Sequence, residues 1–294
     1  MTLREFQRLT QKGTVLLDGA TGSNLRKRGM PAGVCTEAWA AAHPRVVLEL
    51  QREYVDAGSR IIYAPTLSAN RIGLAMHGLE DRLEALNREL VALSRQAAHG
   101  RALVAGNLTT TGRRLSPGGE LRYGALVNIY LEQIEILADA GADLLVAETM
   151  LSLEEAQAAL EAAQGICRLP VMCSLTVDGD GNLPYGGTLI EAAGILQEMG
   201  AAAVGVNCCA ASEKLESVVR AMKEAVTTPL LVKPNAGIPE SDSWGNVHYP
   251  MDARTFARHM RRLVQCGATL IGGCCGTDPE YIRRLGDLCP EGDA

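Results

Sequence analysis

The stretch YGALVNIYLEQIEILADAGADLLVAETMLSLEE, residues 123–155, contains one complete structural repeat of this chain. Its first half predicts an amphipathic helix, because apolar residues recur with a period of about 3.6. Gly141 then marks the end of that helix, and Leu144–Thr149 is an apolar run typical of a buried strand. Ser152-Leu153-Glu154-Glu155 has the capping-box pattern that starts a further helix. The stretch therefore predicts helix, strand and helix in succession.

Similar apolar, β-rich runs occur along the whole chain. They are Val15–Asp18, Ile61–Ala64, Ala102–Leu108, Leu144–Thr149, Val171–Leu175, Ala203–Cys208, Leu230–Pro234 and Thr269–Cys274. Successive runs start roughly 27 to 46 residues apart, the length of a strand, a helix and two loops. These eight repeats show no break in composition and predict an α/β fold, a single (β/α)8 TIM barrel over residues 1–294. A doubly wound open sheet is the main alternative, but no G-x-G-x-x-G follows the first run.

The composition suits such a barrel and excludes some partners. Apolar residues make up 47% of the 294 residues but aromatic residues only 4%, so the core is expected to be aliphatic. The 34 acidic and 28 basic residues give a net charge of -6. No Lys/Arg run is present, which argues against nucleic acid as a partner.

The amino-terminal residues and the cysteines indicate the cell compartment. Residues 1–6 lack the apolar core of a signal peptide, and no apolar stretch is long enough to span a bilayer. We therefore expect a cytoplasmic protein with no membrane partner. Nine cysteines, an odd number, indicate reduced thiols and a metal rather than a disulfide framework.

Two cysteine motifs follow two of the predicted strands. Gly272-Gly273-Cys274-Cys275-Gly276 closes the eighth run, and Gly205-Val206-Asn207-Cys208-Cys209 closes the sixth. The carboxyl ends of barrel strands meet at one rim, so Cys208, Cys274 and Cys275 are predicted to bind one zinc ion whose fourth position is open. Neighbouring strand residues face opposite sides, so only one of Cys208 and Cys209 should be a ligand, and we predict Cys208.

Two other interpretations of the cysteines compete with this one. Cys274 and Cys275 could form a vicinal disulfide or be two buried thiols, and Cys209 could complete a closed structural zinc site. The glycines around the paired cysteines argue against a closed site, because they leave the approach to the metal free of side chains.

Three thiolate ligands favour a particular chemistry. They make zinc a weak Lewis acid and leave a fourth, exchangeable sulfur electron-rich, so the site is suited to alkyl transfer to a thiol rather than hydrolysis. The histidines lie in loops or helical patterns away from the strand ends, and we assign none as a ligand.

Other polar residues follow strands at the same rim. Asp18 and Glu148 are carboxylates that could bind an ammonium group, although each could also be half of a buried ion pair. The residues Gly19, Ala20 and Thr21 offer backbone N–H groups to an anion such as a carboxylate. A thiol amino acid would fit this combination. Asn235, in a Pro-Asn-Ala-Gly turn, is either a turn former or a weak zinc ligand that substrate displaces.

These motifs together resemble the homocysteine S-methyltransferase family over nearly the whole chain. The residues that carry the resemblance are Asp18-Gly19-Ala20, Glu148-Thr149, Gly205-Val206-Asn207-Cys208, Pro234-Asn235-Ala236-Gly237 and Gly272-Gly273-Cys274-Cys275-Gly276-Thr277. The segment around Thr176-Val177-Asp178 is most similar to the homocysteine-binding module of cobalamin-dependent methionine synthase.

The resemblance implies a function and roles for these residues. It implies zinc on Cys208, Cys274 and Cys275, and methyl transfer to homocysteine to give methionine. Asp18 and Glu148 would then bind the amino group, the first loop the carboxylate, and Asn235 the fourth zinc position of the resting enzyme. The methyl group would come from an external donor: a methyl-corrinoid protein, S-methylmethionine or a betaine-like compound.

Two segments depart from the family pattern. Ala64-Pro65-Thr66-Leu67 replaces a Thr-Asn-Thr-Phe segment, and Asn107-Leu108-Thr109-Thr110-Thr111-Gly112 replaces a Gly-Pro turn. Both follow predicted strands and would border the mouth of the cavity. They motivate an alternative in which the same zinc-thiolate site uses another thiol or accepts methyl groups in a corrinoid-dependent demethylation system. A non-catalytic zinc-binding protein is the third interpretation.

Overall fold

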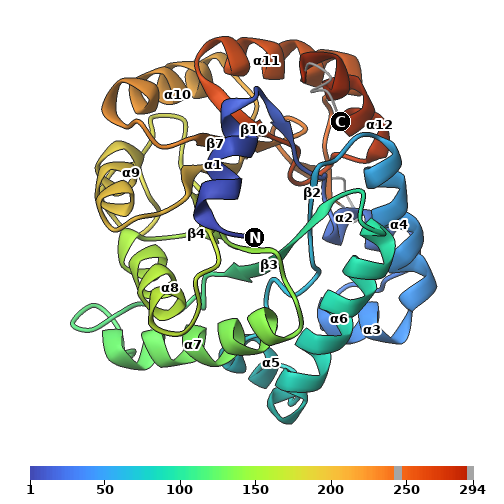
Figure 1. Cartoon of the computed structure of the whole chain (residues 1–294), viewed down its shortest axis with the longest axis vertical. Coiled ribbons are helices and arrows are strands. Elements are labelled where there is room, and N and C mark those ends of the chain that lie inside the picture. Colours follow the sequence, from blue (N-terminus) through green and yellow to red (C-terminus); the bar gives the residue numbers. More distant parts are fainter. Residues whose placement is uncertain (242–246, 290–294) are drawn as a thin grey trace.

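The computed structural model describes residues 1–241 and 247–289, and eight parallel strands form the centre of the fold. Figure 1 shows them as a ring inside a ring of helices. The strands are β1 (Val15–Leu16), β2 (Ile61–Tyr63), β3 (Leu103–Thr109), β4 (Leu144–Met150), β5 (Val171–Leu175), β6 (Ala203–Ala210), β7 (Leu230–Asn235) and β10 (Ala268–Ile271). Their order in the sheet is β1-β10-β7-β6-β5-β4-β3-β2.

The two ends of this sheet meet and close it. Leu17, one residue beyond β1, makes a parallel bridge with Ile61 of β2. The backbone N–H of Arg60 also donates to the carbonyl of Leu16 at 2.7 Å. The prediction of a (β/α)8 barrel is therefore confirmed. The order of strands follows the sequence because each βα unit places its strand beside the preceding one.

Helices cover the outside of the barrel (Figure 1). The structure contains α1 (Leu3–Gln11), α2 (Gly22–Lys27), α3 (Thr36–Ala42), α4 (Pro44–Asp56), α5 (Arg71–Ala75), α6 (Leu83–Ala98), α7 (Tyr123–Asp139), α8 (Leu153–Ile166), α9 (Leu189–Glu198), α10 (Glu213–Ala225), α11 (Ala253–Gln265) and α12 (Pro279–Leu285), with 3-10 turns at Glu80–Arg82 and Gly286–Leu288. One apolar core lies between the strands and the helices. A second fills the inside of the barrel at the end near α1, with residues such as Leu17, Val146 and Leu231. Both are mainly aliphatic, as the composition predicts.

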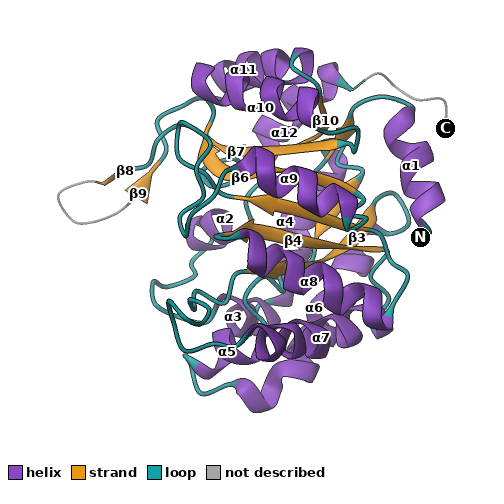
Figure 2. Cartoon of the chain, turned by 90° about the vertical axis from the view of Figure 1, so that its left-hand side faces the viewer, coloured by secondary structure: helices purple, strands orange, loops and turns teal. Residues whose placement is uncertain are grey.

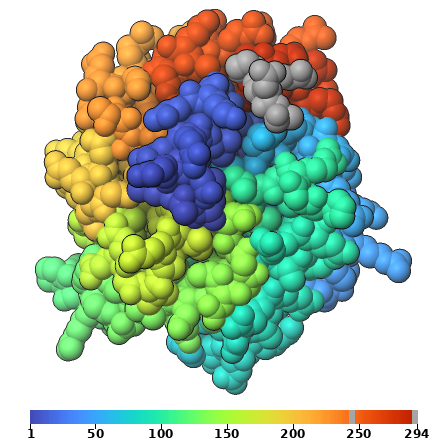
Figure 3. All heavy atoms as spheres, viewed as in Figure 1, coloured from blue at the N-terminus to red at the C-terminus, as the bar shows by residue number. Residues whose placement is uncertain are grey.

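Helix α1 closes one end of the barrel. It lies across the centre of the ring, and in the space-filling view it covers that opening (Figures 1 and 3). Its Phe6 is fully buried in the same apolar cluster as the inward-facing strand residues. The carboxyl ends of the strands lie at the opposite end (Figure 2), so the site must be built there.

Local signals in the sequence have the structural effects expected of them. Ser152 Oγ accepts a hydrogen bond from the backbone N–H of Glu155 at the start of α8, and Thr188 and Glu191 form a full capping box on α9. Gly141 has a φ of 89°, the left-handed conformation that ends a helix before a strand.

Two details differ from the expectation. β10 ends at Ile271, so the segment Gly272–Cys275 lies in the loop after the strand instead of ending the strand. An antiparallel hairpin of β8 (Glu240–Ser241) and β9 (Val247–His248) also projects from the rim on the side opposite α1 (Figure 2). The sequence shows no alternating apolar pattern there, because the hairpin residues are exposed on both faces.

The described helices do not have the features of a membrane-spanning helix. Within residues 1–241 and 247–289, no helix combines the length and apolar character that a bilayer span requires.

Candidate metal centre and acceptor site

Three cysteine sulfurs come together at the carboxyl rim of the barrel. The Sγ atoms of Cys208, Cys274 and Cys275 all lie within 4.8 Å of one another, and all three residues are partly buried. Cys208 comes from the end of β6, and the other two from the loop after β10. The structure thus brings together the three residues that the sequence singled out.

The spacing of these sulfurs fits a soft metal ion. A tetrahedral zinc ion binds sulfur at about 2.3 Å, which separates two thiolate ligands by about 3.8 Å. In the protein alone, hydrogen bonds with Cys208 and Cys274 lower the pKa of Cys275 to about 2, whereas hydrogen bonds with Cys208 and Cys275 raise the pKa of Cys274. Cys274 and Cys275 are both free thiols, so the alternative of a vicinal disulfide does not describe this structure.

The backbone at Cys208 aims its side chain at this cluster. Cys208 has a φ of 56°, in the left-handed region that non-glycine residues rarely adopt, and the register of β6 with β7 shifts between Asn207 and Ala210. As a result, Asn207 and Cys208 both face the site although they are neighbours. Cys209 is not part of the cluster and packs against the outer core. The choice of Cys208 over Cys209 agrees with this geometry, but simple strand alternation does not explain it.

Backbone hydrogen bonds fix the loop that carries Cys274 and Cys275. The N–H of Cys274 donates to the Pro234 carbonyl at 2.7 Å, and the N–H of Gly273 donates to the Asp18 carbonyl at 3.1 Å. Thr277 is fully buried, and its hydroxyl donates to the Cys274 carbonyl at 2.8 Å while accepting from the N–H of Ala20. The cysteine loop is therefore tied to both β1 and β7, which reduces its freedom to move.

Asn235 also supports the cysteine loop. Its Oδ1 accepts a hydrogen bond from the backbone N–H of Cys275 at 3.0 Å, and its side chain is buried. The sequence left two roles open, a turn former and a weak metal ligand. The observed contact adds a third, since it holds the backbone of Cys275 in place.

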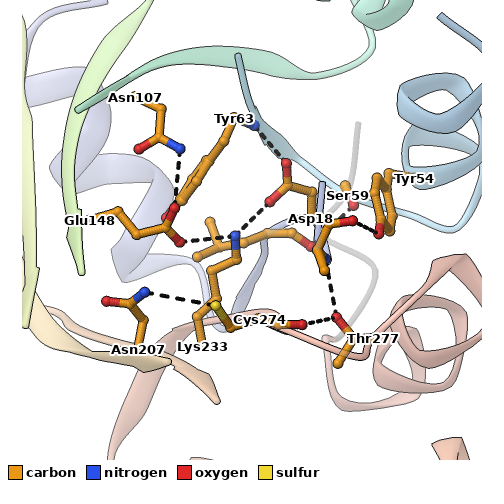
Figure 4. A network of polar contacts seen from close by, with 12 residues as sticks. Asp18, Tyr54, Ser59, Tyr63, Asn107, Glu148, Asn207, Lys233, Cys274 and Thr277 are labelled. Atoms are coloured by element: carbon orange, nitrogen blue, oxygen red, sulfur yellow. Dashed lines mark hydrogen bonds and ion pairs between the residues drawn. The ribbon is translucent and has the colours of Figure 1, made fainter. Parts of the chain in front are cut away.

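Asn207 connects three strands beneath the sulfurs. Its Oδ1 accepts from the N–H of Thr149 and from Ser174 Oγ, both at 2.9 Å, and its Nδ2 donates to Thr149 Oγ1 at 2.6 Å. The same Nδ2 lies 3.9 Å from Cys274 Sγ (Figure 4). Thr149 itself has a φ of 60°, a strained conformation for a β-branched residue, and these bonds help to hold it.

Replacing Asn207 by alanine should therefore weaken metal binding without removing a ligand. We expect an affinity loss of about 10- to 100-fold, the usual effect of removing a group that orients a metal ligand. Competition with a chromophoric chelator measures it. Asn128→Ala, on the exposed side of α7, is the control and should leave the affinity unchanged. An unchanged affinity in Asn207→Ala would show that the cysteine loop alone orients the sulfurs.

The two predicted carboxylates also come together, but with a third group between them. Asp18 and Glu148 are both buried, and Lys233 Nζ lies 2.9 Å from Asp18 Oδ1 and 3.4 Å from Glu148 Oε1 (Figure 4). Lys233 is not among the residues that the sequence predicted for the site. In the sequence it stands out as the one basic residue within the apolar run Leu230–Pro234. It lies two positions after Leu231, whose side chain faces into the barrel, so it is expected to face inward as well.

The two segments that depart from the family pattern support this group. Asn107 Nδ2 donates to Glu148 Oε2 at 3.1 Å. Thr66 Oγ1 donates to the Asn107 carbonyl and accepts from the N–H of Asn107, so the loop after β2 is joined to strand β3, which extends to Thr109. Further along, the buried carboxylate of Glu155 accepts from the hydroxyls of Thr110 and Thr111. The unusual residues thus form part of the site's framework.

The first loop is packed more closely than its sequence suggests. A Cβ atom on Gly19 would lie 2.7 Å from the Tyr54 hydroxyl, so only glycine fits. The N–H of Ala20 is bonded to Thr277, and the Ala20 carbonyl accepts from Tyr54 and from Asn24. Binding of an anion by the backbone of Gly19, Ala20 and Thr21 stays a prediction. Of these three N–H groups, that of Ala20 already has Thr277 as a hydrogen-bond partner.

Tyr249, the residue after β9 of the hairpin, contacts the cluster at Cys275. Burial raises its pKa, and so do the charge of Cys275 and the hydrogen bond between the two side chains. Gly276 makes this approach possible, because a Cβ there would lie 2.4 Å from the Tyr249 side chain. No apolar or charge pattern marks this tyrosine in the sequence, since it lies in the irregular segment between β9 and α11.

Comparisons with known proteins place this geometry in a family. The family model described as homocysteine S-methyltransferase matches residues 15–289. Betaine–homocysteine S-methyltransferase 1 of Mus musculus is 30% identical over 309 residues, covering 97% of this chain and 75% of that protein. The methionine synthase of Mycobacterium leprae is 26% identical over 289 residues. That match covers 91% of this chain but 24% of the synthase, so the chain spans about a quarter of that relative's length.

A solved structure agrees over the full length of the fold. The metallated form of the homocysteine methyltransferase MmuM from Escherichia coli superposes with a TM-score of 0.78 at 26% identity, covering 96% of this chain and 98% of that one. The residues matched by the family model, 15–289, span all eight barrel strands and both cysteine motifs of this chain. The chain belongs to the homocysteine S-methyltransferase family.

Proposed function

We propose that this protein transfers a methyl group from an external donor to the thiol sulfur of homocysteine, which gives methionine. The observation that carries the proposal is the cluster of Cys208, Cys274 and Cys275, with sulfurs within 4.8 Å of one another at the rim where barrel enzymes hold their substrates. The names of the mouse and Escherichia coli relatives support homocysteine as the acceptor.

We further propose zinc as the metal. The three clustered sulfurs would be a soft donor set that suits zinc. A tetrahedral ion held by three protein ligands has a fourth position, which a substrate sulfur would fill. When bound, zinc lowers the pKa of an added thiol and keeps it as a nucleophilic thiolate. The chain's own contribution is to fix the three sulfurs, through Asn235 and Thr277 on the cysteine loop and through Asn207 beneath it.

The reaction itself is a displacement at the methyl carbon. The acceptor's S–H proton goes to solvent, the S–CH3 bond forms, and the donor leaves with the pair of electrons that bound the methyl group. Within the site, Gly19, Ala20 and Thr21 lie beside the cysteine loop and stay candidates for binding the acceptor's carboxylate. Asp18 and Glu148 lie in the same network of polar residues as Cys274 (Figure 4).

The proposed reaction also needs a methyl donor from outside the chain. A methyl-corrinoid protein, S-methylmethionine and a betaine-like compound are the candidates, in line with the range of relatives. A turnover screen of homocysteine against methylcobalamin, S-methylmethionine, S-adenosylmethionine and betaine will identify the class.

X-ray absorption at the zinc edge tests the metal site directly. The zinc-loaded protein should show three sulfur ligands, and addition of homocysteine should bring in a fourth. The matched control is methionine, which offers the same carbon skeleton without a thiol and should leave three. A four-sulfur sphere that does not change with homocysteine would instead indicate a structural metal site and contradict the proposal.

A further inference from the structure

The buried ammonium group of Lys233 lies where the sequence predicted the ammonium group of a substrate. Lys233 extends from β7 into the upper barrel, and only 4% of its side chain is exposed. Its Nζ donates to Asp18 Oδ1 at 2.9 Å and to Glu148 Oε1 at 3.4 Å. The Nζ atom also lies 3.9 Å from the centre of the Tyr63 ring, a cation–π contact on a third side.

The remaining oxygens of the two carboxylates have partners as well. Asp18 Oδ2 accepts from the backbone N–H of Tyr63 at 2.7 Å, and Glu148 Oε2 accepts from Asn107 Nδ2 at 3.1 Å. All four carboxylate oxygens therefore have a donor supplied by the protein (Figure 4). An incoming ammonium group would have to share or displace one of these donors.

The charges of Asp18 and Glu148 favour a charged Lys233 between them. Burial alone would lower the pKa of Lys233, but the negative charges of Asp18 and Glu148 outweigh it and raise that pKa well above its usual value. Lys233 is therefore charged, and it neutralises one of the two negative charges. The attraction that two unpaired carboxylates would exert on a substrate cation is correspondingly weaker.

The surrounding backbone is shaped to hold the lysine in place. A Cβ atom on Gly272 would lie 3.0 Å from Lys233 Cγ, so the glycine leaves room for the lysine stem. Swinging Nζ away would leave buried carboxylates without a counter-charge, which is strongly unfavourable. Displacement of Lys233 by a substrate ammonium is thus opposed by both packing and charge.

We propose that Lys233 takes the place of the acceptor's ammonium group as the partner of Asp18 and Glu148, so that this site does not select its thiol by an α-amino group. The inference rests on the proposed function, methyl transfer to a thiol. It names the acceptor class as short aliphatic mercaptocarboxylates, of which homocysteine is one and its desamino analogue, 4-mercaptobutyrate, is another. Lys233 takes no part in the bond changes: either thiol loses its proton to solvent and gains the methyl group from the donor.

Binding of these two thiols to the zinc-loaded protein provides the test. Isothermal titration calorimetry gives both dissociation constants without a methyl donor. A charge-assisted hydrogen bond to a substrate ammonium is worth about 1.5–3 kcal/mol, so a site that used one would bind homocysteine at least about tenfold more tightly. We expect the wild-type protein to bind the two thiols within about threefold of each other.

Lys233→Met supplies the second half of the experiment. It frees both carboxylates while keeping most of the side-chain volume, so the preference for homocysteine over 4-mercaptobutyrate should rise by about tenfold or more. Lys223→Met, on the outer helix α10, is the matched control and should keep the wild-type ratio. If Lys233→Met does not fold, the wild-type comparison alone decides, because it does not depend on a variant.

The outcomes separate this inference from the proposed function. A wild-type preference for homocysteine of tenfold or more, or a ratio unchanged in a folded Lys233→Met protein, would overturn the role of Lys233 and leave methyl transfer to homocysteine intact. If neither thiol binds, the proposed function and the inference both fall.

Discussion

Replacing Cys208 by alanine should abolish metal binding and methyl transfer, whereas the same replacement at Cys209 should leave both nearly unchanged. Cys208 Sγ belongs to the three-sulfur cluster, and Cys209 packs against the outer core. Losing one of three thiolates removes a covalent anchor of the metal and the charge that makes the fourth sulfur nucleophilic. We expect less than one-tenth of the wild-type zinc per chain and a fall in turnover of about 1,000-fold or more.

This pair of variants is informative because the two cysteines are adjacent. Both substitutions remove the same atom from the same strand, so a general effect on folding would appear in both. Elemental analysis after dialysis gives the zinc content, and a methionine-formation assay gives the turnover. Full zinc in Cys208→Ala, or loss of zinc from Cys209→Ala, would mean that the ligands are assigned wrongly.

Among substitutions that add one methyl group to β6, Gly205→Ala should lower the free energy of unfolding most. A Cβ atom at this position would lie 1.9 Å from the backbone carbonyl oxygen of Leu231 in the neighbouring strand. Backbone atoms of a central strand cannot move aside as a flexible side chain can, so the barrel must distort. We expect a loss of at least about 3 kcal/mol in the free energy of unfolding, or no folded protein.

Gly194→Ala is the matched control for that variant. Gly194 lies in helix α9, and a Cβ there would meet no atom within 4 Å. Alanine favours the helix over glycine, so this variant should be more stable by up to about 1 kcal/mol. Urea unfolding measures both. Equal effects of the two substitutions would show that the gap between β6 and β7 can widen.

The fold was largely predictable because its signals are local. The βα repeats carry their own apolar runs and helical periods, several helices have a side-chain cap, and β5, for example, has the predicted bounds Val171–Leu175. The hairpin of β8 and β9 was not predictable in this way. Its strands are short and exposed on both faces, so no pattern of apolar residues marks them.

The cysteine cluster was predictable for a different reason. Barrel topology alone brings the ends of the sixth and eighth strands to one rim, so placing the thiols required only the repeat count. The conformation of Cys208 was not predictable, since its φ of 56° depends on the irregular pairing of β6 with β7. Lys233 was missed because a pair of carboxylates in a sequence does not reveal which cation lies between them.

Ring closure has a consequence for the synthesis of this protein. The eighth strand of the barrel, β10, pairs with the first, β1, and Cys274 and Cys275 lie in the loop that follows it. Two of the three clustered sulfurs thus leave the ribosome only after the other seven strands. A nascent chain that stops before Cys274 would have an open sheet and a single cysteine of the cluster, so barrel closure and assembly of the proposed metal site depend on the same late segment.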